Sequence, residues 1–222
     1  MVTDADLYED ARKHMVDSQI RPNRVTDPRI LSAMRTLPRE LFVPPNARAL
    51  AYADEDVPLG HGRVLMEPMV LARMLQAAAL REQETVLVVG AGTGYGAAVL
   101  DACGCRVVAL EEDPALLAIA GDALGRIAPG VRLVSGSLSG GWPAQAPYDL
   151  VFIEGAVPEI PAVLAAQTRQ ESGRILTALT DNGLTTRAIL AEATSLGLGI
   201  TPLFDCNTPI LTAFRKAPAF AF

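Results

Sequence analysis

The feature that most constrains the fold is a glycine-rich turn directly after a short apolar run. Residues 85–89 are Thr-Val-Leu-Val-Val, and Gly90, Gly92 and Gly94 follow at alternate positions before a helix-like stretch. An apolar, β-branched run of this length is typical of a strand buried on both faces. Glycines after such a strand let the backbone approach a ligand, and the next helix offers free N–H donors. The pattern therefore predicts a ligand site at the end of a parallel strand.

An acidic residue follows the next predicted strand. Residues 106–110 are predicted as the second strand, apolar after Arg106, and Glu111 comes directly after it. A carboxylate at that place can accept hydrogen bonds from both hydroxyls of a ribose. The Gly-x-Gly-x-Gly spacing lacks the third glycine of a pyrophosphate site, so it favours S-adenosyl-L-methionine (SAM) over a dinucleotide. We expect SAM as the cofactor.

Two other interpretations of the turn stay open. Read two residues later, Gly92-x-Gly94-x-x-Ala97 would fit a nicotinamide cofactor and hence an oxidoreductase. That frame places its first glycine inside the turn instead of at the end of the strand, which is why we rank it second. The remaining interpretation is a Rossmann-like sheet that binds no ligand.

Strands and helix-length segments alternate through the rest of the chain. A helix is predicted after the glycine turn and another at residues 114–127. After Asn182-Gly183, residues 186–193 and 199–204 fit an antiparallel pair that finishes the sheet, although 186–193 fits a helix equally well. The pattern predicts an α/β fold with a doubly wound, Rossmann-like parallel sheet and an antiparallel last strand. The further parallel strands are predicted at residues 131–134, 150–153 and 174–179.

A helical extension is predicted before the sheet. Residues 3–36 have a helical pattern with a break around residues 21–23. The helix restarts at Pro28, which suits the first turn, and Thr26 or Asp27 can cap it.

An irregular segment separates this extension from the sheet. Residues 54–63 are interpreted as an acidic, glycine-bearing loop, and Pro68 opens a helix that runs to about residue 80. We expect a single SAM-methyltransferase-like domain over residues 1–222. Within it, residues 1–66 would form the helical extension and an acceptor-side loop, and residues 67–222 the Rossmann-like core.

Composition and charge exclude several classes of protein. The net charge of −6 and the pI near 5.0 argue against a nucleic-acid-binding protein. Three cysteines, Cys103, Cys105 and Cys206, are too few and too oddly spaced for a disulfide framework or a metal site. The acidic N-terminus does not resemble a signal peptide, and the apolar stretch 85–105 contains Asp101 and five glycines. We expect a cytoplasmic protein without metal, nucleic-acid or membrane partners.

Several further sequence blocks are distinctive. They are Met15-Val16-x-x-Gln19-Ile20-Arg21, Asp27-Pro28-Arg29-Ile30-Leu31-x-Ala33-Met34, Pro38-Arg39-Glu40-x-Phe42-Val43-Pro44, Ala51-Tyr52-x-Asp54, Pro58-Leu59-Gly60-x-Gly62, Gly141-Trp142-Pro143, Ala146-Pro147-Tyr148-Asp149 and Gly173-Arg174. With the glycine turn, they make residues 15–179 resemble the protein-L-isoaspartate O-methyltransferase family. The resemblance implies SAM-dependent methylation of isoaspartyl carboxylates in damaged proteins, a protein-repair reaction on a protein or peptide substrate.

The chain departs from that family at functional positions. Arg63-Val64-Leu65-Met66 stands where the family has Gln-Thr-Ile-Ser, whose hydroxyls line the active site. Val88 and Ser137 replace acidic residues, Ser137 lying in the family's Gly-Asp-Gly beside the adenine. Glu154 replaces a small or hydroxyl residue. From the turn and the resemblance together, the predicted cofactor-binding residues are Gly90, Ala91, Gly92, Thr93, Gly94, Tyr95, Glu111, Glu112, Ser137 and Leu138.

Three residues are candidates for catalysis. Glu154 ends the fourth predicted strand, where sheets of this kind bind ligands, and it could act as a base. Arg63 could hold a carboxylate, and His61 lies in the loop on the acceptor side.

Two alternatives to carboxyl methylation stay open. Because Val64 and Met66 cannot donate hydrogen bonds, the chain could bind SAM without catalysis. It could also methylate another acceptor, an amine or hydroxyl, with Glu154 as the base.

Overall fold

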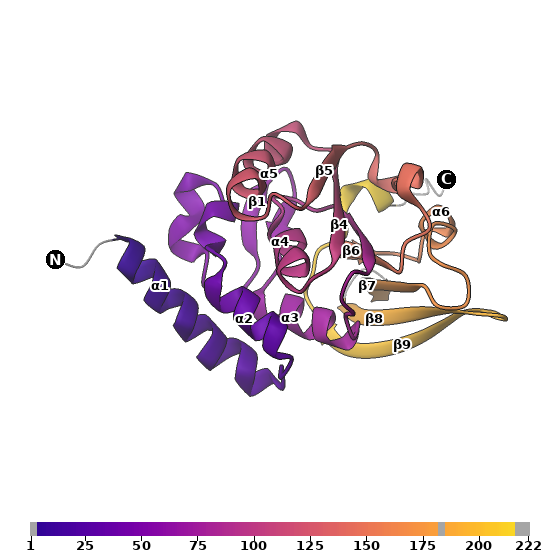
Figure 1. The fold of residues 1–222 in the computed structure, drawn as a ribbon, viewed down its shortest axis with the longest axis horizontal. Helices are drawn as coiled ribbons and strands as arrows, with labels where there is room; N and C mark the ends of the chain where they lie inside the picture. Colours follow the sequence, from indigo (N-terminus) through magenta and orange to yellow (C-terminus); the bar gives the residue numbers. More distant parts are fainter. Residues whose placement is uncertain (1–3, 182–184, 216–222) are drawn as a thin grey trace, which may run out of the picture.

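A seven-stranded sheet forms the centre of the protein in a computed structural model that describes residues 4–181 and 185–215. The strand order is β5-β4-β3-β6-β7-β8-β9 (Figure 1). Strands β3 to β7 run parallel, and β8 and β9 are antiparallel to their neighbours. The predicted parallel sheet with an antiparallel end is confirmed. The strands are β3 (Thr85–Val89), β4 (Arg106–Glu111), β5 (Arg132–Ser135), β6 (Leu150–Val157), β7 (Arg174–Asp181), β8 (Thr185–Thr194) and β9 (Gly197–Cys206).

The strand order reverses between β3 and β6. The chain runs outward from β3 through β4 to β5, then returns to pair β6 with the other side of β3. In open sheets of this type, ligands bind in the crevice at the carboxyl ends of the strands that flank such a reversal. The connection from β3 carries the glycine turn, so the predicted ligand site lies at this crevice.

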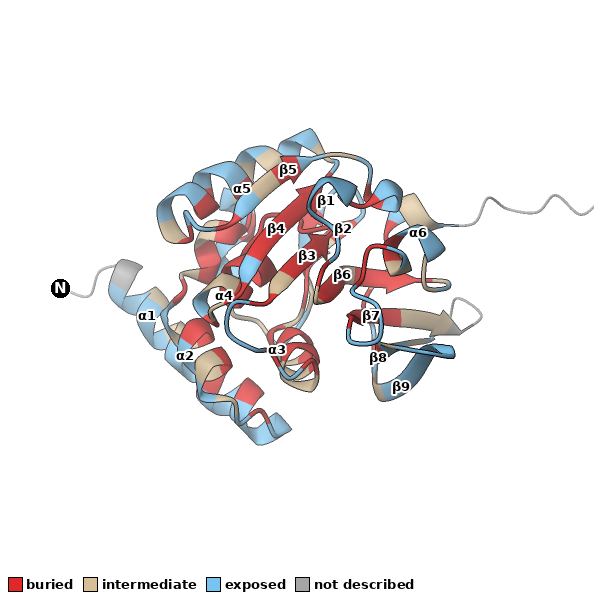
Figure 2. Cartoon of the chain, turned by 45° about the vertical axis from the view of Figure 1, so that its right-hand side comes forward, coloured by how far each residue is buried: buried red, intermediate tan, exposed pale blue. Residues whose placement is uncertain are grey.

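Each face of the sheet packs against its own apolar core. Alternate residues of a strand point to opposite faces. Val86 and Val88 join a core with the N-terminal helices and helices α3 (Pro68–Ala77), α4 (Tyr95–Ala102) and α5 (Pro114–Ile127). Leu87 and Val89 join a smaller core with helix α6 (Ala162–Ala165) and with Leu211 near the C-terminal end. The buried strands between these layers are red in Figure 2.

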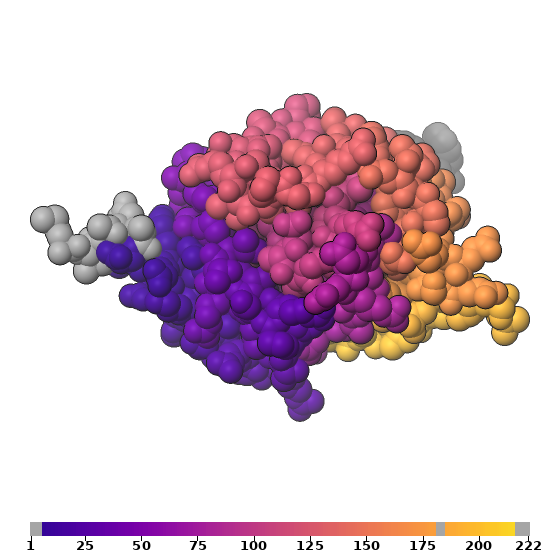
Figure 3. Space-filling view, in the orientation of Figure 1, coloured from indigo at the N-terminus to yellow at the C-terminus, as the bar shows by residue number. Residues whose placement is uncertain are grey.

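The N-terminal extension is helical, as predicted. It contains α1 (Asp4–Met15), a π-helical turn (Val16–Ile20), a 3-10 turn (Arg21–Asn23) and α2 (Pro28–Thr36). The side chain of Asp27 accepts a hydrogen bond from the backbone N–H of Arg29 at 2.9 Å, which confirms the predicted cap. In the space-filling view, the indigo extension lies directly against the magenta residues of the core (Figure 3). No helix in the described part of the chain is long and apolar enough to cross a membrane.

Two predictions of local structure are wrong. Residues 54–63, expected as a loop, contribute to a hairpin of β1 (Val57–Gly60) and β2 (Arg63–Leu65), with His61 at its tip. The hairpin forms because Val57 and Leu59 alternate with exposed residues, and because Gly60 and Gly62 take positive φ at the turn. The strand expected to end at Ile153 continues as β6 through Val157, and its pairing with β7 shifts between Phe152 and Ala156. Glu154 therefore lies inside an irregular strand. The turn predicted at Asn182-Gly183 lies outside the described residues.

Candidate functional site

The glycine turn lies beside the ends of two neighbouring strands. Val89 pairs with Leu110 of β4 and with Ile153 of β6, so the turn stands between Glu111 and Glu154. Gly90, Gly92 and Gly94 all take positive φ, from 58° to 95°, a backbone conformation that side chains disfavour.

Glu111 is fully buried and its carboxylate accepts four hydrogen bonds. Its Oε2 accepts from the N–H of Gly92 at 2.7 Å. Its Oε1 accepts from the N–H groups of Glu112 and Asp113 at 2.9 and 3.1 Å, and from Nη1 of Arg63 at 2.9 Å. Three of these four donors share Oε1, so Oε2 keeps one further acceptor position, and Arg63 takes part of the capacity that the two hydroxyls of a ribose would use.

Arg63 extends from β2 into the crevice. Its Nη2 donates to the carbonyl oxygen of Gly90 at 2.7 Å, while Nη1 donates to Glu111. The side chain is 8% exposed, so this is a buried ion pair with charge-assisted hydrogen bonds. Sequence reasoning placed Arg63 on the acceptor side. The structure instead places its guanidinium on the predicted cofactor turn.

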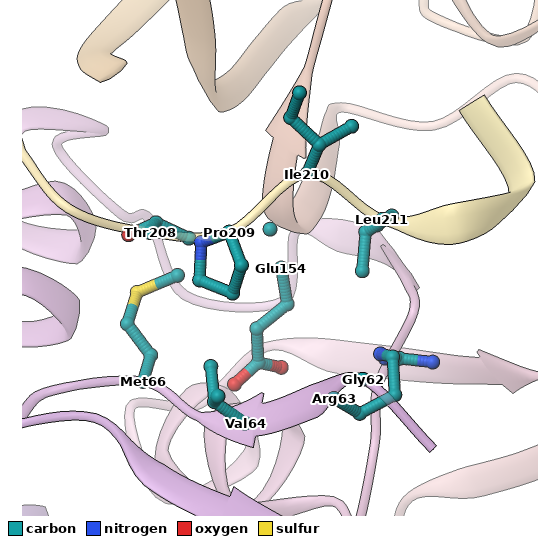
Figure 4. Close-up of a pocket in the computed structure, with 10 residues that line it drawn as sticks. Gly62, Arg63, Val64, Met66, Glu154, Thr208, Pro209, Ile210 and Leu211 are labelled. Atoms are coloured by element: carbon teal, nitrogen blue, oxygen red, sulfur yellow. The ribbon is translucent and has the colours of Figure 1, made fainter. Parts of the chain in front are cut away.

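A segment near the C-terminus crosses the same crevice, and we call residues 208–214 the C-terminal strap. The N–H of Ala156 donates to the carbonyl of Pro209 at 3.0 Å, and the N–H of Leu211 donates to the carbonyl of Ala156 at 3.0 Å. Leu211 is 4% exposed, and in Figure 4 its side chain lies next to that of Arg63. No motif in the sequence assigns this segment to the site, although its apolar pair Ile210-Leu211 indicates burial.

A small cavity remains between the strap and the hairpin. Its volume is about 10 Å³, roughly the room for one water molecule. The acceptor and donor groups around the glycine turn fit an adenosyl cofactor in their chemistry, and in this conformation the side chains of Arg63 and Leu211 lie against Gly90. The side chains that line the cavity include those of Arg63, Val64, Met66, Glu154, Thr208 and Leu211 (Figure 4).

Glu154 presents a carboxyl oxygen without a partner to this cavity. Its Oε2 is shielded from solvent and has no hydrogen-bond partner among the described residues. Burial raises the pKa of Glu154 to about 8, against the charges of Arg63 and Arg39, which lower it. The carboxyl group therefore holds its proton at pH 7. A protonated carboxyl can donate a hydrogen bond, which a carboxylate cannot.

The side chains of Thr93 and Tyr95 point away from the crevice. Thr93 Oγ1 donates to the carbonyl of Phe42, and the Tyr95 ring packs against Phe42 with the Arg39 guanidinium 4.7 Å from its centroid. Arg39 is itself fully buried and donates to the backbone carbonyls of Ala51 and Met66. At these two predicted cofactor positions, only the backbone is available to a ligand, because both side chains pack against Phe42.

The other predicted site residues lie around the rim. His61 is 66% exposed and contacts Asp113, a residue that sequence reasoning missed and whose carboxylate caps α5. Glu112 Oε2 accepts from the N–H of Leu138 at 3.1 Å, so these two predicted cofactor residues are brought together. The Ser137 hydroxyl contacts the hydroxyl of Ser139 at 3.0 Å. Ala91 is buried at the start of the turn.

The family model for protein-L-isoaspartate (D-aspartate) O-methyltransferase matches residues 10–189. Among curated proteins, a protein-L-isoaspartate O-methyltransferase of Anaeromyxobacter is 43% identical over 169 residues, covering 76% of this chain and 69% of that protein. One from Rhodopseudomonas palustris is 41% identical over 165 residues, or 74% and 67% of the two chains. One from Marinobacter nauticus is 36% identical over 187 residues, or 83% and 84%.

Solved structures show the same fold. A protein-L-isoaspartate O-methyltransferase structure superposes with a TM-score of 0.77 at 24% identity, covering 90% of this chain. This chain spans 65% of the length of that one. A structure from Plasmodium falciparum, described as a possible member of the same family in complex with S-adenosyl-L-homocysteine, gives a TM-score of 0.76 at 17% identity and covers 91% and 98% of the two chains. The matched residues and the shared fold establish that this chain belongs to the protein-L-isoaspartate O-methyltransferase family.

Proposed function

We propose that this chain is a SAM-dependent methyltransferase that acts on the carboxylate of isoaspartyl residues in proteins or peptides. Family membership supports the reaction. The observation that carries the cofactor assignment is the buried carboxylate of Glu111, hydrogen-bonded to the backbone of Gly92 at the switch point of the sheet. Gly90, Gly92 and Gly94 would lie along the cofactor, with Glu112 and Leu138 at its outer end.

We assign Glu154 a role in orienting the acceptor. The acceptor carboxylate is ionised at pH 7 and needs no base, so positioning supplies most of the catalysis. Val64 and Met66 line the cavity without hydroxyl groups. Glu154 lines the same cavity, and in its protonated form it can donate a hydrogen bond to the acceptor and does not repel its charge. It would thereby replace the missing hydroxyls.

Isoaspartyl peptides provide the direct test. The protein is incubated with SAM and an isoaspartyl peptide, and methyl ester formation is followed by mass spectrometry. The matched peptide with an ordinary aspartyl residue is the control for the substrate. We expect ester only on the isoaspartyl peptide, and much less with Glu154→Ala than with Glu154→Gln, because the amide can still donate. Ester formation on neither peptide, by a protein that binds SAM, would reject the proposed reaction.

A second candidate function is SAM binding without methyl transfer. The specific observation in its favour is that Val64 and Met66 provide no hydrogen-bond donors beside the cavity. The same assay separates the two functions, since this candidate requires SAM binding without ester on any peptide.

Two properties of the whole chain complete the proposal. We assign residues 1–222 to one domain, supported by a core that joins Met15 and Ile30 of the extension with Val88 and Leu124 of the Rossmann-like part. We also assign the protein to the cytoplasm, supported by three cysteines that are buried and free.

A further inference from the structure

The space that glycines leave open above the turn is filled by the chain itself. A Cβ atom placed on Gly90 would lie 3.0 Å from Cδ1 of Leu211 and 3.2 Å from Nη2 of Arg63. A Cβ atom on Gly155 would lie 2.5 Å from Cγ of Leu211. Glycine at these two positions therefore gives room to Leu211 and Arg63, in the same crevice where a ligand would contact the backbone.

Arg63 occupies the polar groups that a cofactor would use. Its two terminal nitrogens bind the Gly90 carbonyl and the Glu111 carboxylate. SAM carries an ammonium group and two ribose hydroxyls, and these donors need acceptors of the same kind at the same turn. The guanidinium therefore competes with the donors of the cofactor for the Gly90 carbonyl and the Glu111 carboxylate.

The strap is held by apolar packing of Leu211 in the smaller core and by few backbone hydrogen bonds to the sheet. Only two backbone hydrogen bonds, both to Ala156, tie it to β6 within the described residues. Thr208 Oγ1 is buried without a hydrogen-bond partner in the described part of the structure, so the docked strap leaves a polar group unsatisfied. After Arg63 withdraws, Glu111 would keep its three backbone donors, so its charge would remain hydrogen-bonded.

We infer that Arg63 and Leu211 form a built-in closure of the cofactor cleft, and that SAM binds only when the strap lifts and Arg63 leaves Glu111. This inference rests on the proposed function, because it concerns the same cleft. The apparent affinity for SAM is then the intrinsic affinity multiplied by the fraction of molecules that are open. Changes that weaken the closure should therefore tighten binding, although they remove contacts from the protein.

Calorimetric titration with SAM tests whether weakening the closure tightens binding. We expect Leu211→Ala and Arg63→Gln each to bind SAM about tenfold more tightly than the wild type, because each raises the open fraction. Leu196→Ala, at a residue that is 99% exposed, and Arg132→Gln, at an exposed residue of β5, are the matched controls and should leave the affinity unchanged. Circular dichroism checks that each variant is folded. If Arg63→Gln does not fold, Leu211→Ala alone carries the test.

Hydrogen exchange gives a readout that does not depend on affinity. In the wild type without SAM, the Leu211 amide should be protected by its bond to Ala156, and saturating SAM should accelerate exchange across residues 208–214. Tight binding of SAM with unchanged strap protection, and no gain in the two variants, would overturn the closure and leave the proposed function intact.

A different pattern would reject the proposed function. If neither the wild type nor the opened variants bind SAM, the cofactor assignment fails. The docking of the strap is then tested by hydrogen exchange alone. Protection of Leu211 that is lost in Arg63→Gln supports the coupling of the two residues, and fast exchange of Leu211 in the wild type refutes it.

Discussion

The Glu154→Gln variant removes a titrating group from the crevice and keeps its size. The charged and polar groups that face Glu154 come from four parts of the fold. They are Arg63 on β2, Arg39 in the extension, Glu111 at the end of β4 and the N–H of Gly96 on α4. Burial outweighs the two arginines, so the pKa of the carboxyl rises from 4.5 to about 8.

The raised pKa of Glu154 determines how the stability of the fold changes with pH. Between the unfolded pKa of 4.5 and the folded pKa of about 8, the folded chain holds a proton that the unfolded chain has released. The Glu154 contribution to stability is therefore complete below pH 4.5 and is lost as the pH rises through 8. The difference between the two pKa values corresponds to at most about 5 kcal/mol across this window. The glutamine variant has no proton to lose.

Urea unfolding at several values between pH 5 and pH 9 measures this contribution. We expect the free energy of unfolding of the wild type to fall by several kcal/mol relative to Glu154→Gln over that range, since other groups cancel in the difference. Glu192→Gln, at an exposed carboxylate on β8, is the control and should follow the wild type. Parallel curves for wild type and Glu154→Gln would show that Glu154 titrates like an exposed carboxyl, and its role as a neutral hydrogen-bond donor would then be refuted.

Three further predictions follow from the site and the extension. Glu111→Gln, made in the Arg63→Gln background so that neither protein has the ion pair of the closure, removes the charge that faces the glycine turn; SAM should bind roughly ten- to a hundredfold more weakly than to Arg63→Gln alone by calorimetry, and equal affinity would reject the ribose assignment. Val64→Thr combined with Met66→Ser adds two hydroxyls beside the cavity and should increase the rate of ester formation on an isoaspartyl peptide; an unchanged rate would show that donors at these positions do not limit the reaction. Asp27→Ala removes the cap of α2 and should lower the free energy of unfolding by about 1 kcal/mol in urea, with SAM affinity unchanged, and a loss of affinity would contradict the separation of this cap from the site.

The sheet could be predicted from sequence because its signals are local. The apolar runs of β3, β4 and β6 are short and lie between glycines, prolines and charges, so their positions and parallel arrangement were clear. The hairpin of β1 and β2 was missed because Gly60 and Gly62 mark a hairpin tip as well as a loop. The extent of β6 was missed because Glu154 and Gly155 interrupt its apolar pattern.

The site could be predicted only in part, because some of its residues are placed by long-range contacts and not by local sequence patterns. The neighbourhood of Gly92 and Glu111 follows from the register of parallel strands, which a sequence pattern implies. The position of Arg63 depends on the direction of a hairpin, and that of Leu211 on a segment that returns to the sheet from far along the chain. Such long-range contacts leave no periodic signal in the sequence around either residue.

The strap lies near the C-terminal end of the chain, so it is synthesised after the strands that form the crevice. The crevice forms from β3, β4 and β6, and all three leave the ribosome before Leu211 has been added. At about 5–20 residues per second, synthesis from Ile153 to Leu211 takes roughly 3–12 s. A nascent chain therefore passes through a period in which the strap does not yet cover the cleft. In refolding from denaturant, the whole chain is present from the start. SAM added during translation therefore meets a cleft without the strap, whereas SAM added after refolding meets a cleft with the strap docked.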